Sequence, residues 1–99
     1  VLVVDDELYV REGMRAVLES FGCRVYTADG LDSALSVARS AKPDLALVDL
    51  RLRADGDGLQ TIARLRDLYP GLPALVISGD TAPERLRAVG TSGIPILIK

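Results

Sequence analysis

Carboxylates follow two short apolar runs of the 99-residue chain. Asp5 and Asp6 come directly after the run Val1–Val4, and Asp49 comes directly after Leu45–Val48. A continuous apolar run of this length, bounded by polar residues, is typical of a strand buried on both faces. Each acid is therefore expected at the C-terminal tip of a strand, which is where open α/β sheets bind their ligands.

Two further polar groups end apolar runs later in the chain. Ser78 closes the run Pro73–Ser78, and Lys99 follows Ile94–Ile98. If the sheet is parallel, all of these groups lie on one edge. Carboxylates completed by carbonyls and waters are ligands that Mg²⁺ accepts, and a carboxylate beside such an ion can attack a phosphoryl group. An ammonium and a hydroxyl would then hold the phosphoryl oxygens, so the set predicts a phosphoryl-accepting site.

Each group taken alone also has an ordinary structural explanation. Asp5 and Asp6 would suit the cap of a following helix, and Asp49 would suit a turn. Ser78 is also common in caps and turns, and a terminal Lys99 is usually a solvated charge. Independent caps would not select three acids, a hydroxyl and an ammonium for one edge, so the joint occurrence favours the chemical interpretation.

The rest of the chain alternates between helical and strand patterns. Apolar residues at helical spacing predict a helix from Leu8 that Gly22 ends. A short alternating segment at 24–28 predicts a second strand. Further helices are expected at 31–38, 59–66 and 83–89. Lys42-Pro43 should stop the helix that begins at residue 31. Five strands alternating with four helices predict an α/β, doubly wound parallel sheet with right-handed crossovers. The buried face of the first helix is expected to comprise Val10, Met14, Val17, Leu18 and Phe21.

Length and composition indicate one ordinary domain over residues 1–99. Hydrophobic residues make up 48% and charged residues 26%, and the net charge of −2 gives no reason to expect nucleic acid or an anionic membrane as partner. No apolar run approaches the ~18 residues of a membrane span. The single Cys23 suits a reducing compartment, so we expect the cytoplasm. Because the chain opens on a strand without Met, and because a fifth helix beyond Lys99 is needed to cover the last two strands, we expect it to be part of a longer protein.

Four segments resemble the signatures of the response-regulator receiver domain in order and spacing. The resemblance implies a flavodoxin-like receiver fold with strand order 2-1-3-4-5. It also implies a place in a two-component phosphorelay, in which a phosphoryl group passes from a partner histidine to this domain. The end of the chain is most similar to receivers of hybrid sensor histidine kinases. The four segments are Val3-Val-Asp-Asp-Glu7, Leu47-Val-Asp-Leu50, Val76-Ile-Ser-Gly79 and Ile98-Lys99.

The same resemblance assigns roles to the acids. Asp49 is implied to be the phosphoacceptor and, with its neighbours, to bind Mg²⁺. Asp6 is implied to ligate the ion directly, with Asp5 acting mainly through water. The backbone carbonyl of Arg51 is implied as a further ligand.

The resemblance also implies a switch. Ser78 would swing its hydroxyl toward the phosphoryl group, and Lys99 would pair with that group. Family members often carry an aromatic three residues before the lysine, where this chain has Ile96. The aromatic part of the switch is therefore in question, whereas the movement of Ser78 is not.

The chain contains no histidine, so a histidine kinase or a histidine phosphotransfer domain is expected to supply the phosphodonor imidazole, unless a small-molecule phosphodonor replaces it. We expect no direct nucleic-acid binding and no membrane insertion by this domain, and a homodimer stays open. The sequence does not identify the cognate kinase, the signal or the output domain.

Three other functions fit the sequence less well. A haloacid-dehalogenase-like phosphatase also begins with a strand ending in Asp, but it needs its second acid two residues later, and Asp5 is followed by Asp6 and Glu7. A flavin or nucleotide binder would want a Ser/Thr/Gly-rich phosphate loop and more aromatics than the 4% present. A receiver that signals without phosphorylation would not need all five site residues. We therefore expect a signalling phosphoacceptor rather than a turnover enzyme.

Overall fold

The computed structural model describes residues 1–50, 58–79, 87, 90 and 93–98 of the chain. Strands and helices alternate as far as β4, as the apolar patterns predict. In chain order the elements are β1 (Leu2–Val4), α1 (Leu8–Ser20), β2 (Tyr26–Ala28), α2 (Leu31–Ala41), β3 (Ala46–Asp49), α3 (Gly58–Leu68), β4 (Ala74–Ser78) and β5 (Ile96–Ile98).

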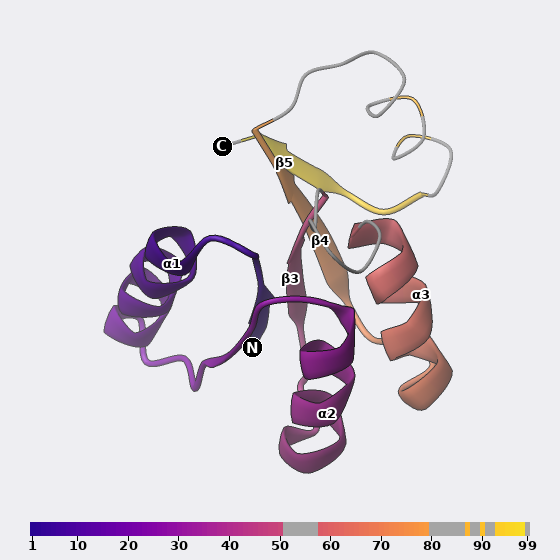
Figure 1. The fold of residues 1–99 in the computed structure, drawn as a ribbon, viewed down its shortest axis with the longest axis horizontal. Coiled ribbons are helices and arrows are strands. Elements are labelled where there is room, and N and C mark those ends of the chain that lie inside the picture. The colour runs from indigo at the N-terminus through magenta and orange to yellow at the C-terminus, as the bar shows by residue number, and fades with distance from the viewer. Residues whose placement is uncertain (51–57, 80–86, 88–89, 91–92, 99) are drawn as a thin grey trace.

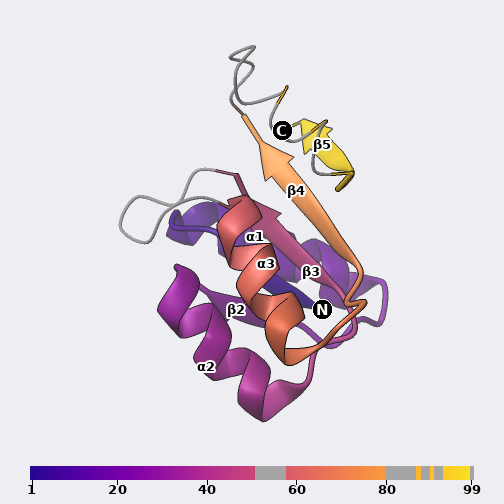
Figure 2. The ribbon, with the colours of Figure 1, turned by 90° about the vertical axis from the view of Figure 1, so that its right-hand side faces the viewer.

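The strands form one parallel sheet in the order β2-β1-β3-β4-β5, with β3 at its centre (Figure 1). The arrows of β3 and β4 point the same way in Figure 2, so their C-terminal tips share an edge. The predicted α/β fold and the strand order implied by the resemblance are both confirmed.

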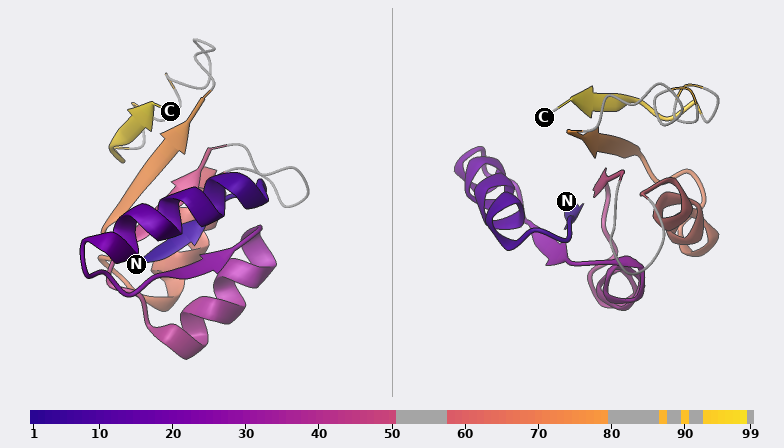
Figure 3. Two further views of the ribbon diagram at one scale, coloured as in Figure 1. Left: turned by 90° about the vertical axis from the view of Figure 1, so that its left-hand side faces the viewer. Right: turned by 45° about the horizontal axis from the view of Figure 1, so that its top comes forward.

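Helices lie on both faces of this sheet. In the right-hand view of Figure 3, α1 lies on one side, and α2 and α3 lie on the other. Alternate residues of each strand point to opposite faces, so Leu2 and Val4 join the larger core cluster with Ile62 and Leu65 of α3. Val3 points the other way and joins a smaller cluster beneath α1.

The prediction that α1 buries its apolar face is only partly confirmed, because no residue of the helix is fully buried. Val17 is 57% exposed and Phe21, which follows the last helical turn, is 78% exposed. Met14 and Leu18 are half-buried and pack against the smaller cluster. Helix α1 lies against the sheet mainly over β1 and β2.

The ends of the elements follow the sequence signals. Helix α2 ends at Ala41, and Lys42 adopts a left-handed conformation with φ +50° before Pro43, whose ring disfavours a further helical residue. Gly22 has φ +86°, as expected of a residue that ends a helix. Strand β2 starts two residues later than predicted, and the helix expected at 83–89 falls almost entirely outside the described residues. Among the described helices, none combines the length and apolar character that crossing a membrane requires.

Candidate functional site

The site lies at the C-terminal edge of the sheet. Asp5 directly follows β1, Asp49 is the last residue of β3, and Ser78 is the last residue of β4. Parallel pairing in register carries all three to the same edge. One carboxylate oxygen from each of Asp5, Asp6 and Asp49 lies within 4.8 Å of the other two. The structure therefore brings together the three acids that the sequence analysis singled out.

These side chains are largely removed from solvent. Asp5 is 1% exposed, Asp49 is 6% exposed and Ser78 is 1% exposed, while Asp6 is half-buried. Charged carboxylates are costly to bury unless a cation or hydrogen bonds compensate them, and three together repel one another. The cluster is thus poised to accept a cation.

Asp5 is positioned by backbone hydrogen bonds rather than by a capping role. Its N–H donates to the carbonyl of Ala28 in the neighbouring strand β2, at 3.1 Å. Its Oδ1 accepts the N–H of Glu7, at 2.9 Å. Glu7 is itself the residue at the N-cap of α1, whereas a capping side chain would bond one of the N–H groups of the first turn. The hydrogen bonds orient Asp5 toward the cluster, which agrees with the chemical interpretation.

Asp49 is positioned by its place in the middle of the sheet. The N–H of Leu50 donates to the carbonyl of Ile77 at 2.8 Å, which extends the pairing of β3 with β4 past Asp49. The N–H of Gly58 then donates to the carbonyl of Leu50 at 2.8 Å and brings the start of α3 against the same backbone. A methyl group on Gly58 would collide with the Asp49 carbonyl oxygen and would lie 3.0 Å from the Leu50 Cα.

Sequence reasoning did not single out Gly58 as a site residue. The loop holds Gly56 as well as Gly58, and nothing local distinguishes which of the two meets the strand. The requirement arises from the approach of α3 to β3, which is a tertiary contact.

Of the remaining residues that the sequence analysis assigned to the site or its switch, the structure describes only Ile96. Arg51 and Lys99 lie outside the described residues. Ile96 lies in β5 opposite Val76, is half-buried and packs against the larger core cluster. An aliphatic side chain therefore occupies the position at which the family resemblance led us to look for an aromatic.

The acidic cluster fits a hard divalent cation. Mg²⁺ takes oxygen ligands at about 2.0–2.1 Å, so two ligands on opposite sides of one ion lie about 4.2 Å apart. Carboxylate oxygens that all lie within 4.8 Å of one another match this spacing with little adjustment. The donor set is also right, because Mg²⁺ prefers carboxylates, carbonyls and water to nitrogen or sulfur.

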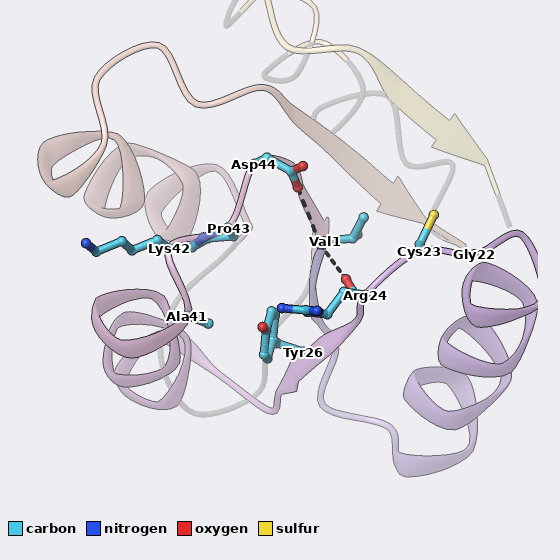
Figure 4. A pocket seen from close by; sticks show the side chains of 9 residues that line it. All are labelled: Val1, Gly22, Cys23, Arg24, Tyr26, Ala41, Lys42, Pro43 and Asp44. Atoms are coloured by element: carbon cyan, nitrogen blue, oxygen red, sulfur yellow. Dashed lines mark hydrogen bonds and ion pairs between the residues drawn. The ribbon is translucent and has the colours of Figure 1, made fainter.

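A pocket lies at the opposite edge of the sheet from the acidic cluster, where β1 and β3 begin (Figure 4). Lys42 lies beside it on the segment that leads from α2 to β3. The acidic residue of this pocket, Asp44, pairs with the N-terminal ammonium at 3.5 Å. The pocket lacks the clustered carboxylates of the other edge, so it offers no comparable cation site. Its lining comprises Val1, Gly22, Cys23, Arg24, Tyr26, Ala41, Lys42, Pro43 and Asp44.

Comparison with known proteins gives one consistent family. The family model described as "Response regulator receiver domain" matches residues 1–99. The chain is 42% identical over 78 residues to the KDP operon transcriptional regulatory protein KdpE of Escherichia coli, covering 79% of this chain and 34% of that protein. It is 38% identical to the probable transcriptional regulatory protein TcrX of Mycobacterium tuberculosis, covering 94% and 39%. The chain thus spans little more than a third of the length of these relatives.

Solved structures agree with the sequence comparison. The receiver domain of NtrX from Brucella abortus superposes with a TM-score of 0.88 at 31% identity, covering 99% of this chain and 83% of that one. A response regulator from Burkholderia pseudomallei, solved with a phosphorylated aspartic acid, a calcium ion and citrate, gives 0.86 at 33% identity, covering 99% and 58%. With its sheet order and its edge of acids, this chain belongs to the response regulator receiver domain family of two-component signalling.

Proposed function

We propose that Asp49 accepts a phosphoryl group from a partner's phosphohistidine in a Mg²⁺-dependent reaction. The observation that carries the proposal is the meeting of Asp5, Asp6 and Asp49 within 4.8 Å, with Asp49 at the tip of the central strand. A phosphorylated aspartic acid and a calcium ion in the Burkholderia pseudomallei relative support the same chemistry in this chain.

In the reaction a carboxylate oxygen of Asp49 attacks the phosphorus atom. A P–O bond forms as the P–N bond to the imidazole breaks, and the nitrogen keeps the electron pair and takes a proton from water. Asp5, Asp6 and the Arg51 carbonyl would hold Mg²⁺, which supplies positive charge to the phosphoryl oxygens. The hydrogen bonds to Asp5 described above keep that carboxylate oriented before any ligand arrives.

Ser78 and Lys99 are proposed to hold the transferred group. Ser78 lies at the tip of β4, directly beside β3, and is paired in register with Ile98 of β5, which Lys99 follows. We propose that the Ser78 hydroxyl donates to a phosphoryl oxygen and that the Lys99 ammonium pairs with one. The modification adds about −1.5 to −2 charges at this edge, which is the input that would bias the conformational switch.

The phosphodonor must come from outside the chain, because the chain has no histidine. A histidine kinase or histidine phosphotransfer domain in the cytoplasm is the proposed partner. KdpE and TcrX are named as transcriptional regulatory proteins, so we propose that this chain is the receiver part of a longer regulator. A receiver within a hybrid sensor kinase is the alternative, and in either case nucleic-acid binding would belong to another domain.

The test is labelling by acetyl phosphate with Mg²⁺, followed by intact-protein mass spectrometry. The wild-type chain should gain one phosphoryl group, and Asp49→Asn should gain none because it lacks the nucleophilic oxygen pair. Asp44→Asn is the matched control, since Asp44 precedes the same strand at its other end and its side chain is 90% exposed. Removal of the metal with EDTA should also abolish labelling. Normal labelling of Asp49→Asn would overturn the proposal.

A haloacid-dehalogenase-like phosphatase is disfavoured by the spacing of the first acids. That class needs its second acid two residues after the nucleophile at the end of the first strand, whereas Asp5 is followed by Asp6 and Glu7. We expect no sustained turnover of p-nitrophenyl phosphate, beyond the single equivalent that a phosphoacceptor consumes and slowly releases.

A further inference from the structure

Arg11 of α1 reaches back to the acidic edge. Its Nη1 donates a hydrogen bond to the backbone carbonyl of Asp5 at 2.7 Å, in a part-buried setting. That carbonyl belongs to the peptide unit joining Asp5 to Asp6. The guanidinium is therefore hydrogen-bonded to the short stretch of backbone from which two of the three clustered carboxylates extend.

This bond completes the support of Asp5. The N–H of Asp5 is held by Ala28 of β2, and its carboxylate accepts the Glu7 N–H. The carbonyl is the third point of attachment, and a side chain six residues later supplies it. Without Arg11 the peptide unit between the two acids would keep its strand and side-chain contacts but lose the bond that fixes its rotation.

The guanidinium also lies near a second loop. Asp29, at the start of the turn between β2 and α2, has its pKa lowered first by a hydrogen bond from Ser33 and further by the charge of Arg11. Arg11 is thus close enough to Asp29 to attract it.

We propose that Arg11 is a positioning residue for the metal-binding acids: by holding the Asp5 carbonyl it presents the Asp5 and Asp6 carboxylates ready to receive a divalent cation. This rests on the proposed function of the acidic cluster. It assigns no contact with the ion to Arg11 itself.

The guanidinium has two effects on metal affinity that oppose each other. Its positive charge repels a cation, whereas its hydrogen bond orders the ligands. Partners that orient metal ligands from outside the coordination shell typically change affinity about 10–100-fold. We expect the ordering to dominate, because the hydrogen bond acts directly on the backbone that joins the two acids. If Arg11 orders the ligands, removing it should weaken Mg²⁺ binding. If it acts only through its charge, removing it should strengthen Mg²⁺ binding.

The experiment is calorimetric titration with MgCl₂ alone, without phosphodonor. Arg11→Met, which removes donor and charge, should weaken Mg²⁺ binding about tenfold. Arg11→Lys, which keeps a charged donor on a long stem, should recover most of the affinity. Arg15→Met is the control, because Arg15 lies one turn later on α1, pairs with Glu19 at 3.5 Å and should not alter Mg²⁺ binding.

Two outcomes would overturn the proposal. Tighter Mg²⁺ binding in Arg11→Met would show that the side chain acts only through its charge. A lower urea midpoint of the metal-free protein with unchanged Mg²⁺ affinity would show that it acts only on folding. Acetyl phosphate labelling at saturating Mg²⁺ separates this test from the proposed function, because Arg11→Met should still be labelled whereas Asp49→Asn should not.

Discussion

Gly58 lies against the backbone of the strand that carries Asp49. A Cβ atom there would meet the Asp49 carbonyl oxygen and the Leu50 Cα, and both are backbone atoms that cannot rotate away. Contact of α3 with β3 therefore requires a residue without a side chain at this position. Any larger residue must displace either the helix or the tip of the strand.

Gly58→Ala is expected to slow labelling of Asp49 and to lower the free energy of unfolding by about 1–3 kcal/mol, as overpacking does in other cores. Gly13→Ala is the matched control, because a Cβ at Gly13 of α1 meets nothing within 4 Å. Its stability should rise by about 0.5–1 kcal/mol from helix propensity, with unchanged labelling. Urea denaturation and an acetyl phosphate time course measure the two effects.

If Gly58→Ala loses stability but is labelled at the wild-type rate, the displacement is taken up by α3 and the strand tip stays in place. The proposed link between this glycine and the phosphoacceptor would then be wrong.

The polar residues at the strand ends could be predicted from the sequence, whereas the residues that position them could not. Asp5, Asp49 and Ser78 each close an apolar run, and parallel pairing then brings them to one edge. Gly58 and Arg11 act through contacts with residues distant in the chain or across a turn, which leave no local pattern. Arg11 in particular has the spacing of an ordinary solvated helix residue.

At the scale of elements, the turn from β2 into α2 is organised by Ser33. Its Oγ donates to Asp29 Oδ1 at 2.6 Å and accepts the N–H groups of Asp29 and Gly30, both at 3.1 Å. These bonds satisfy donors at the start of the helix that would otherwise have no intrahelical partner. The hydrogen bond to the carboxylate holds the pKa of Asp29 below its ordinary value of 3.8, with a smaller contribution from Arg11.

Ser33→Ala is expected to lower the free energy of unfolding by about 1 kcal/mol near neutral pH, the usual net value of such hydrogen bonds. Because the pKa of Asp29 is lowered on folding, the carboxylate contribution is present above pH 3.8 and is lost as the pH falls through the folded-state pKa. The difference between wild type and variant should therefore shrink below that pH. This part is small, since Asp29 is exposed.

Urea midpoints at pH 7, 4.5 and 3 measure the effect. Ser36→Ala serves as control, because Ser36 is an exposed residue of the same helix and the two changes alter helix propensity equally. A wild-type-minus-variant difference that stays constant down to pH 3 would contradict the linkage to Asp29.

The elements themselves could be predicted more reliably than their burial. The spacing of apolar residues identified α1, but the same spacing could not show that Val17 and Phe21 stay exposed. Amphipathic periodicity shows which side of a helix is apolar. How far that side is buried depends on the elements that pack against it from elsewhere in the chain.

At the scale of the whole molecule, the two faces of the sheet are covered unequally. The face under α2 and α3 holds the larger cluster, including Leu65, which is fully buried. Among the described residues, the face under α1 holds four buried ones, and Leu97 of β5 is 56% exposed. We propose that chain following β5 covers this second face in the longer protein.

Matched Leu→Ala substitutions on the two faces test this proposal. In the 99-residue chain Leu65→Ala should lower the free energy of unfolding by about 2–5 kcal/mol, because it removes fully buried methyl groups and leaves a cavity. Leu18→Ala should cost about 1 kcal/mol or less, since Leu18 is only half-buried and its site can fill with solvent. In a chain extended by the natural residues after Lys99, the cost of Leu18→Ala should rise toward that of Leu65→Ala, as added chain buries the same side chain more fully. Urea denaturation of both variants at both lengths gives the comparison. An unchanged cost of Leu18→Ala in the longer chain would mean that the second face stays open and serves another contact.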